Sequence, residues 1–321
     1  MRVLVLGAAG MIGRKLAERL ARDGVVAGAP VSLLSLVDVV EPAPPEAGLP
    51  VETAVADLAE PGVADGLVAG RPEVIFHLAA VLSGEAEADF DKGYRVNLDG
   101  TRSLFEAVRA VGAGYRPRLV FASSIAVFGA PFPEQIGDEF HATPLTSYGT
   151  QKAIGELLLC DYTRRGFLDG VGVRLPTICV RPGEPNRAAS GFFSGIVREP
   201  LNGQDAVLPV PDETRHWFAS PRAAVDFLLH AAALDGDALG DRRCLTMPGV
   251  SATVADEIAA LRRVGGDEAV RHIRREPDET VARIVAGWPG GFDARRALGL
   301  GFRPEADFEE IVRVYVEDEL S

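Results

Sequence analysis

A short apolar run, a glycine-rich turn and an amphipathic segment follow one another at the start of the chain. Residues 2–6 read RVLVL, GAAGMIG follows directly, and apolar residues then recur at helical spacing up to Gly24. This order predicts a strand, a tight turn and a helix. The three glycines of the turn are Gly7, Gly10 and Gly13. They give a G-x-x-G-x-x-G spacing that differs from the standard G-x-G-x-x-G. The physical result is the same, because the backbone can approach a pyrophosphate at a helix N-terminus. A purely structural turn is the alternative.

Further apolar runs alternate with helical patterns through the first half of the chain. They cover residues 31–37, 51–58, 73–81, 117–124 and 171–183. Most connections are too long for hairpins, so we expect six strands in a doubly wound parallel sheet, an α/β fold of the Rossmann type. Ligands of such sheets bind beyond the carboxyl ends of the strands. The predicted site therefore lies at that edge.

The amino-acid composition of the chain changes after Pro182, where Pro, Gly and Asn become frequent. We expect residues 1–180 to form an NAD-binding domain, with a helix at 220–235 returning to it. Residues 181–321 are then mainly a smaller α/β C-terminal lobe that binds substrate. That lobe includes a short strand at 243–248 and another at 270–277, with helices beginning near residues 253, 278 and 307.

Acidic and small residues at the strand ends suit a bound dinucleotide. Asp38 ends the second strand, about 20–30 residues after the turn, where a carboxylate accepts hydrogen bonds from a ribose diol. It would repel a 2′-phosphate, so we expect NAD rather than NADP; a turn-capping role for Asp38 is the alternative. Asp57 and Leu58 are expected beside the adenine. Small residues in the segment Leu78, Ala79 and Ala80 would let the cofactor lie against the sheet. His77 is expected to pack beneath its strand.

Tyr148 and Lys152 stand four residues apart at the start of a helical segment, on one face. An ammonium near a phenol lowers the phenol's pKa from its usual value of about 10, so Tyr148 becomes a candidate general base. Many helices contain a Tyr and a Lys at this spacing by chance. The catalytic interpretation of the pair therefore depends on the other motifs of the chain.

Composition excludes several classes of function. The 321 residues carry a net charge of −13, and no basic stripe offsets it, so we expect no nucleic-acid partner. The three cysteines and five histidines show no disulfide framework and no metal-ligand spacing, so we expect a reducing compartment and no metal site. No signal peptide and no membrane-length apolar run is apparent. A soluble, cytoplasmic protein without a membrane partner is expected.

The joint set of motifs GAAGMIG, FHLAA, VNLDGT, SSIAVFG, YGTQK and RLPTICVRPG resembles the extended short-chain dehydrogenase/reductase superfamily, which contains nucleotide-sugar epimerases and dehydratases. The resemblance covers essentially the whole chain. It implies that Tyr148 is the base, that Lys152 activates it and holds the nicotinamide ribose, and that Ser124 orients the substrate. Ser123 is expected to be structural. Asn97 would organise a water relay behind Lys152.

The resemblance also implies a set of cofactor contacts. These are Gly7, Gly10, Met11, Ile12 and Gly13 in the turn, and Pro176 and Thr177 beside the nicotinamide. Where the family often has an aromatic-Val-x-Asp run, this chain reads Arg215-His-Trp-Phe. That departure disfavours a nucleotide sugar as substrate.

Several stretches of the chain resemble one member of the superfamily more closely, and this resemblance implies NAD-dependent oxidation of the C2 hydroxyl of a four-carbon sugar acid. Its carboxylate needs a cation, and Arg suits bidentate contact. The candidates are Arg181, Arg187 and Arg215, with Ser83 for polyol contacts. A nucleotide-sugar epimerase, an enzyme resembling L-threonine dehydrogenase and a non-catalytic NAD-sensing regulator are the alternatives. The apolar helices that begin near Asn97 and Tyr148 suggest a homodimer, since such helices pair across a two-fold axis in the family.

Overall fold

The computed structural model describes residues 1–183 and 190–320, which divide into two compact units. Unit 1 comprises Met1–Val127, Pro144–Arg174 and Val225–Leu245. Unit 2 comprises Phe128–Thr143, Leu175–Ala224 and Thr246–Ser321. Four segments differ from the expected division, in which residues 1–180 and 220–235 form one domain. Residues 128–143, 175–180 and 220–224 group with unit 2, and residues 236–245 group with unit 1.

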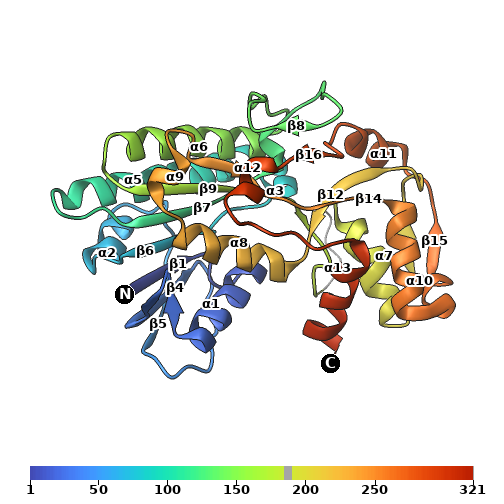
Figure 1. Ribbon diagram of the computed structural model, residues 1–321, viewed down its shortest axis with the longest axis horizontal. Coiled ribbons are helices and arrows are strands. Elements are labelled where there is room, and N and C mark those ends of the chain that lie inside the picture. Colours follow the sequence, from blue (N-terminus) through green and yellow to red (C-terminus); the bar gives the residue numbers. More distant parts are fainter. Residues whose placement is uncertain (184–189, 321) are drawn as a thin grey trace. The chain divides into compact units, whose positions relative to one another are not determined.

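Unit 1 is built on a seven-stranded sheet in the order β13-β9-β7-β6-β1-β4-β5 (Figure 1). The strands are β1 (Arg2–Leu6), β4 (Leu33–Asp38), β5 (Val51–Val55), β6 (Val74–His77), β7 (Arg118–Ser124), β9 (Asp169–Leu175) and β13 (Cys244–Thr246). β1 pairs in parallel with β4 and with β6, so that Leu6 lies opposite both Val37 and His77. The predicted α/β doubly wound fold is confirmed. The short strand near residue 244, expected in the smaller lobe, instead extends this sheet.

Helices cover both faces of the sheet. α2 (Val63–Ala69), α5 (Gly100–Val111) and α6 (Ser147–Arg164) pack together, and Figure 1 shows α5 and α6 on one side of the sheet with α1 (Met11–Asp23) on the other. Residues 225–233 of α8 (Pro221–Ala233) also belong to unit 1. The apolar stripe of α1, including Leu16 and Leu20, is fully buried, which is what holds a surface helix against a sheet.

The segment that leads into α5 is less regular than the helix expected there. α3 (Ser83–Ala88) and α4 (Phe90–Gly93) precede a π-helical turn, η1 (Tyr94–Asp99), and only then does α5 begin. Asn97 lies inside the π-helical turn and is buried. Such turns are rare and frequently occur at functional sites.

Unit 2 has its own apolar core around a three-stranded sheet, β10-β12-β14. The strands are β10 (Thr177–Ile178), β12 (Arg215–Ala219) and β14 (Val250–Thr253). The larger helices are α7 (Gly191–Leu201), α10 (Val254–Val270), α11 (Glu279–Ala286) and α13 (Phe308–Tyr315). Two small pairs complete the unit: β11 (Ala206–Leu208) with β15 (Ile273–Arg275), and β16 (Phe292–Asp293) with β8 (Ile136–Gly137).

The single strand expected over residues 171–183 is divided at Pro176. β9 ends at Leu175 in the large sheet, and β10 begins at Thr177 in the sheet of unit 2. Proline has no backbone N–H to donate to a neighbouring strand, which explains the break. Within the part of the chain that the structure describes, we find no helix with the length and apolarity needed to cross a bilayer.

Candidate active site

The glycine turn after β1 leaves no room for a side chain at Gly7 or Gly13. Gly7 has a φ of +87°, and a Cβ atom there would lie 2.6 Å from the backbone N of Ala79. A Cβ on Gly13 would lie 2.1 Å from the Gly7 carbonyl oxygen. Glycine at both positions therefore lets β1, α1 and the segment after β6 approach one another closely.

The N-terminus of α1 fits an anionic ligand. Its cap residue, Gly10, makes no side-chain capping bond, and no acidic residue lies in the first turn. α6, by contrast, is capped by Thr146, whose Oγ1 accepts a hydrogen bond from Gly149 N at 3.1 Å. The positive end of the α1 dipole is thus not neutralised by a side chain of its own first turn, as expected for a helix that holds a pyrophosphate.

Asp38 lies beside this turn, at the end of β4. Its Oδ2 accepts from Ala9 N at 2.9 Å and its Oδ1 from Val39 N at 2.7 Å. The carboxylate is therefore fixed next to the glycine turn. This position fits a ribose diol, and the two backbone bonds also match the turn-capping alternative.

Asp57 follows β5 and is half-buried. Burial raises the pKa of its carboxyl, but hydrogen bonds from Ala59 N and from Arg95 outweigh it and leave the pKa below its ordinary value. Leu58 is buried, whereas residues 78–80 after β6 are only partly covered. These residues thus line the carboxyl ends of neighbouring strands.

Tyr148 and Lys152 lie on α6, and Lys152 is buried. Its Nζ donates to the Ala122 carbonyl oxygen at 2.8 Å and lies 5.7 Å from the centroid of the Tyr148 ring. Burial lowers the pKa of Lys152 to about 8, and the nearby Glu156 carboxylate opposes this shift. The ammonium is therefore held beside the half-buried tyrosine.

Ser123 and Ser124 end β7 with different surroundings. Ser123 is buried and donates to Glu156 Oε1 at 2.6 Å, as suits a structural residue. The Oγ of Ser124, which is half-buried, accepts from Ala126 N at 3.1 Å. A Cβ on Gly149 would lie 2.2 Å from the Ala126 carbonyl oxygen. The close approach of α6 to this segment brings Ser124 and Tyr148 into one region.

Asn97 is held by a network that the motifs did not reveal. Its Oδ1 accepts from Val81 N at 2.8 Å, and its Nδ2 donates to Val81 O and to Gln151 Oε1 at 3.1 and 2.7 Å. Gln151 is completely buried, although it lies within the YGTQK motif. The sequence did not predict this role for Gln151. It shows only a neutral polar residue inside a helical motif, and the partner, Asn97, is far away in the sequence.

His77 packs beneath its strand as expected and is also buried. Its Nε2 lies 2.8 Å from Thr101 Oγ1, which in turn donates to the Asn97 carbonyl oxygen. Burial, assisted by the charge of Lys152, lowers the pKa of His77 to about 3. His77 is thus a neutral packing residue behind the Asn97 segment.

The predicted substrate residues are spread over both units. Ser83 is exposed at the start of α3 in unit 1. Thr177, in unit 2, pairs its Oγ1 with His216 Nε2 at 2.6 Å and follows Pro176. Arg181 is half-buried in unit 2 and donates from Nε to Ile178 O at 3.0 Å. Arg215 is exposed in the same unit, with its Nη1 3.4 Å from Ser251 O. Arg187 lies outside the described residues, and all these substrate and nicotinamide contacts remain predictions.

A doubly wound sheet that combines an uncapped glycine turn with a Ser–Tyr–Lys set is the architecture of a nicotinamide-dependent oxidoreductase. The model of the NAD dependent epimerase/dehydratase family matches residues 3–235. The chain belongs to this family, as the motifs predicted; it is an NAD-dependent dehydrogenase, and NAD is its cofactor.

Two relatives and one solved structure agree closely with the chain over its length. D-erythronate dehydrogenase of Cupriavidus necator is 48% identical and is aligned over 99% of this chain and 98% of its own length. The enzyme of the same name from Haemophilus influenzae is 42% identical over 99% of both chains. A crystal structure from Agrobacterium tumefaciens, described as a nucleoside-diphosphate-sugar epimerase, is 62% identical with a TM-score of 0.98, covering 100% of this chain and 94% of that one.

Proposed function

We propose that the protein oxidises the C2 hydroxyl of D-erythronate to give 2-oxo-tetronate. The observation that carries the proposal is the buried Lys152 beside Tyr148, with Ser124 at the neighbouring strand end. The full-length similarity to two enzymes named D-erythronate dehydrogenase supports the choice of substrate.

Tyr148 acts as the base that takes the proton of the C2 hydroxyl. The chemistry that bound NAD would supply is acceptance of the hydride that leaves C2. The Lys152 ammonium stabilises the phenolate form of Tyr148, and Ser124 donates a hydrogen bond to the oxygen that becomes the carbonyl. Since the pKa of Lys152 is about 8, this ammonium is largely protonated at neutral pH.

Other residues of the chain hold the reacting groups in place. Gly7, Gly10 and Gly13, with Met11 and Ile12, would hold the pyrophosphate, and Asp38 would hold the ribose. Asn97 positions a water relay behind Lys152. One of the candidate arginines binds the substrate carboxylate. General base catalysis contributes roughly 10²–10⁴-fold, and positioning supplies much of the remaining acceleration.

Replacing Tyr148 by Phe tests the mechanism. We expect the rate of NADH formation from D-erythronate to fall by roughly 10²–10⁴-fold, because the base is removed while the ring remains. Tyr162→Phe is the matched control, since Tyr162 lies on the same helix and its hydroxyl contacts Glu106. Wild-type turnover in Tyr148→Phe would exclude Tyr148 as the base.

The similarity to a structure described as a nucleoside-diphosphate-sugar epimerase favours a second candidate function, epimerisation. Assays with D-erythronate, UDP-glucose, UDP-galactose and L-threonine separate the candidates. Net NADH from D-erythronate supports the proposal. Interconversion of the UDP-sugars without net NADH would replace it with an epimerase, and NADH from L-threonine alone would replace the substrate.

A further inference from the structure

One side chain, that of Asn97, holds both backbone groups of Val81. Asn97 Oδ1 accepts from Val81 N at 2.8 Å, and Asn97 Nδ2 donates to Val81 O at 3.1 Å. Val81 lies in residues 78–82, which join β6 to α3 and form neither helix nor strand. The Asn97 amide therefore bonds this segment in the way that a neighbouring strand would.

At its start the same segment is held against β1 and the glycine turn. Leu78 N donates to Leu6 O at 2.8 Å, and the backbone N of Ala79 lies 2.6 Å from the position of a Cβ on Gly7. Residues 78–80 are only partly covered and follow the carboxyl end of β6, which is where a doubly wound sheet binds its ligand. The residues that would face the cofactor thus lie between two anchors, one at Leu78 and one at Val81.

Gln151 on α6 completes the hydrogen bonds of Asn97. Its Oε1 accepts from Asn97 Nδ2 at 2.7 Å, so the oxygen and both N–H groups of the Asn97 amide are bonded. Because Oε1 can accept only from the nitrogen of that amide, this bond opposes the flipped amide, in which the nitrogen would face Val81 N–H. Gln151 therefore selects the orientation of Asn97 that holds Val81.

The position of the Gln151 side chain is itself fixed. The residue is fully buried, and a Cβ on Gly93 would lie 2.8 Å from its Nε2, so glycine at the end of α4 leaves the space that the amide occupies. Among the described residues, Nε2 has no hydrogen-bond partner. A buried N–H without a partner costs free energy, so stability alone does not account for a glutamine here. What the amide supplies is the acceptor, Oε1.

We propose that Gln151 is a positioning residue, which acts through Asn97 to hold residues 78–82 in place for bound NAD. Gln151 lies on α6 between Tyr148 and Lys152, so the same bond ties the helix of the proposed base to the segment beside the cofactor. All of these residues belong to unit 1. The inference rests on the proposed function for the role of α6 in the reaction. Its readouts are amide exchange and NAD binding, which do not depend on the identity of the substrate.

Amide hydrogen exchange, resolved to single residues in the chain without NAD, tests the anchor at Val81. In the wild type we expect Val81 N–H to be protected, as Leu78 N–H is, because both are bonded. Gln151→Met keeps the length of the side chain and removes the acceptor. In this variant Val81 should exchange about tenfold faster, whereas Leu78 should be unchanged. Equal protection of Val81 in both chains would overturn the proposal. So would an unprotected Val81 in the wild type, which is a test that requires no variant to fold.

Calorimetric titration with NAD gives the second readout. The dissociation constant of NAD should rise about tenfold in Gln151→Met, and KM for NAD should rise by the same factor while kcat falls much less. A merely structural role would reduce the amount of folded enzyme, and with it the apparent kcat, without changing KM. An unchanged dissociation constant would overturn the proposal. If NAD binding changes as expected but D-erythronate is not oxidised, the proposed function fails and the role of Gln151 stands.

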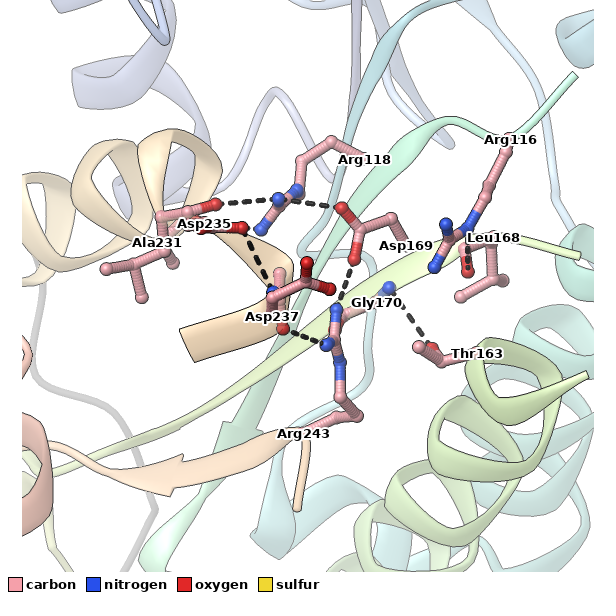
Figure 2. A network of polar contacts seen from close by, with 12 residues as sticks. Arg116, Arg118, Thr163, Leu168, Asp169, Gly170, Ala231, Asp235, Asp237 and Arg243 are labelled. Atoms are coloured by element: carbon pink, nitrogen blue, oxygen red, sulfur yellow. Dashed lines mark hydrogen bonds and ion pairs between the residues drawn. The ribbon is translucent and has the colours of Figure 1, made fainter. Parts of the chain in front are cut away.

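Thr163→Val is the matched control, because it removes another buried acceptor from α6. Thr163 lies at the opposite end of the helix from Tyr148, and its Oγ1 accepts from Gly170 N at 3.1 Å, as Figure 2 shows. This variant should be less stable than the wild type, but its Val81 exchange and its dissociation constant for NAD should not change. A rise in that constant equal to the rise in Gln151→Met would overturn the specific role of Gln151.

A double variant tests whether Gln151 acts through Asn97. If it does, adding Gln151→Met to Asn97→Leu should change the dissociation constant of NAD by less than about twofold, although Gln151→Met alone raises it about tenfold. Additive effects of the two substitutions would mean that Gln151 reaches the cofactor site by another route, and they would overturn the proposal.

Discussion

Two ionisable side chains behind the proposed base, Lys152 and His77, are buried in unit 1. Burial lowers the pKa of each, to about 8 for Lys152 and about 3 for His77. The consequences differ, because Lys152 still holds its proton at neutral pH whereas His77 is neutral. The positive charge of Lys152 repels a proton on His77, so the two side chains do not readily become cations together.

The buried His77 should make unfolding depend on pH. Below its unfolded pKa of about 6.5, the unfolded chain binds a proton that folded His77 does not take up until about pH 3. This contribution to stability is full above about pH 6.5 and is lost as the pH falls. The single group should remove about 2 kcal/mol of the free energy of unfolding between pH 7 and pH 5. In His77→Gln this part of the pH dependence should disappear, as measured by urea unfolding at both pH values.

The matched control is His141→Gln, because the His141 side chain is exposed to solvent in the folded chain. An unchanged difference between pH 7 and pH 5 in His77→Gln would contradict the assignment of His77 as a buried neutral residue.

Among the helices, α6 carries Tyr148 and Lys152, and its contact with the turn η2 (Ile125–Val127) holds both residues in place. The helix is capped by Thr146 at its N-terminus, and Gly149 in its first turn allows the contact. Because the obstructing atom at Gly149 is a backbone oxygen, no side chain can rotate away to make room.

Replacing Gly149 by Ala should therefore move α6 away from η2 and displace Tyr148 and Lys152. We expect a loss of about 1–3 kcal/mol in the free energy of unfolding. Turnover should fall by roughly 10²-fold, the cost of a displacement of about 1 Å. Unfolding and steady-state assays on the same preparation measure both effects.

Gly66→Ala in α2 is the control for Gly149→Ala, since nothing lies within 4 Å of a Cβ at that position. Alanine favours a helix over glycine by about 1 kcal/mol, so this variant should be at least as stable as the wild type. Equal turnover and stability in the two variants would show that the α6–η2 contact is not required.

At the scale of the whole molecule, the homodimer remains a prediction. Leu157 on α6 is 72% exposed, which suits a helix face covered by a second copy of the chain. We expect a dimer at micromolar concentration. Leu157→Glu should shift the chain toward monomer, because a charge would be buried in the apolar contact. Sedimentation equilibrium measures the change.

Leu298→Glu on α12 (Arg295–Gly299) is the control, because this residue is also exposed but lies in unit 2, outside the two helices expected to pair. A monomeric wild type, or a Leu157→Glu variant that dimerises like the wild type, would contradict the prediction.

The doubly wound sheet, the glycine turn and the Tyr148–Lys152 pair could all be predicted from the amino-acid sequence. These features depend on residues that are close together in the chain: strand and helix periodicities differ, glycines mark the close approach, and a spacing of four places two side chains on one helical face. The family followed from the same local motifs.

The contacts between residues that are distant in the sequence became visible only in the folded chain. Folding paired Gln151 with Asn97 and placed β13 at the edge of the large sheet. Neither of these has a local pattern, because each depends on how separate segments pack. The π-helical turn around Asn97 was missed for a related reason, since its apolar spacing resembles that of an α-helix. Local patterns specify elements, whereas the contacts that tune their side chains arise when the elements are packed.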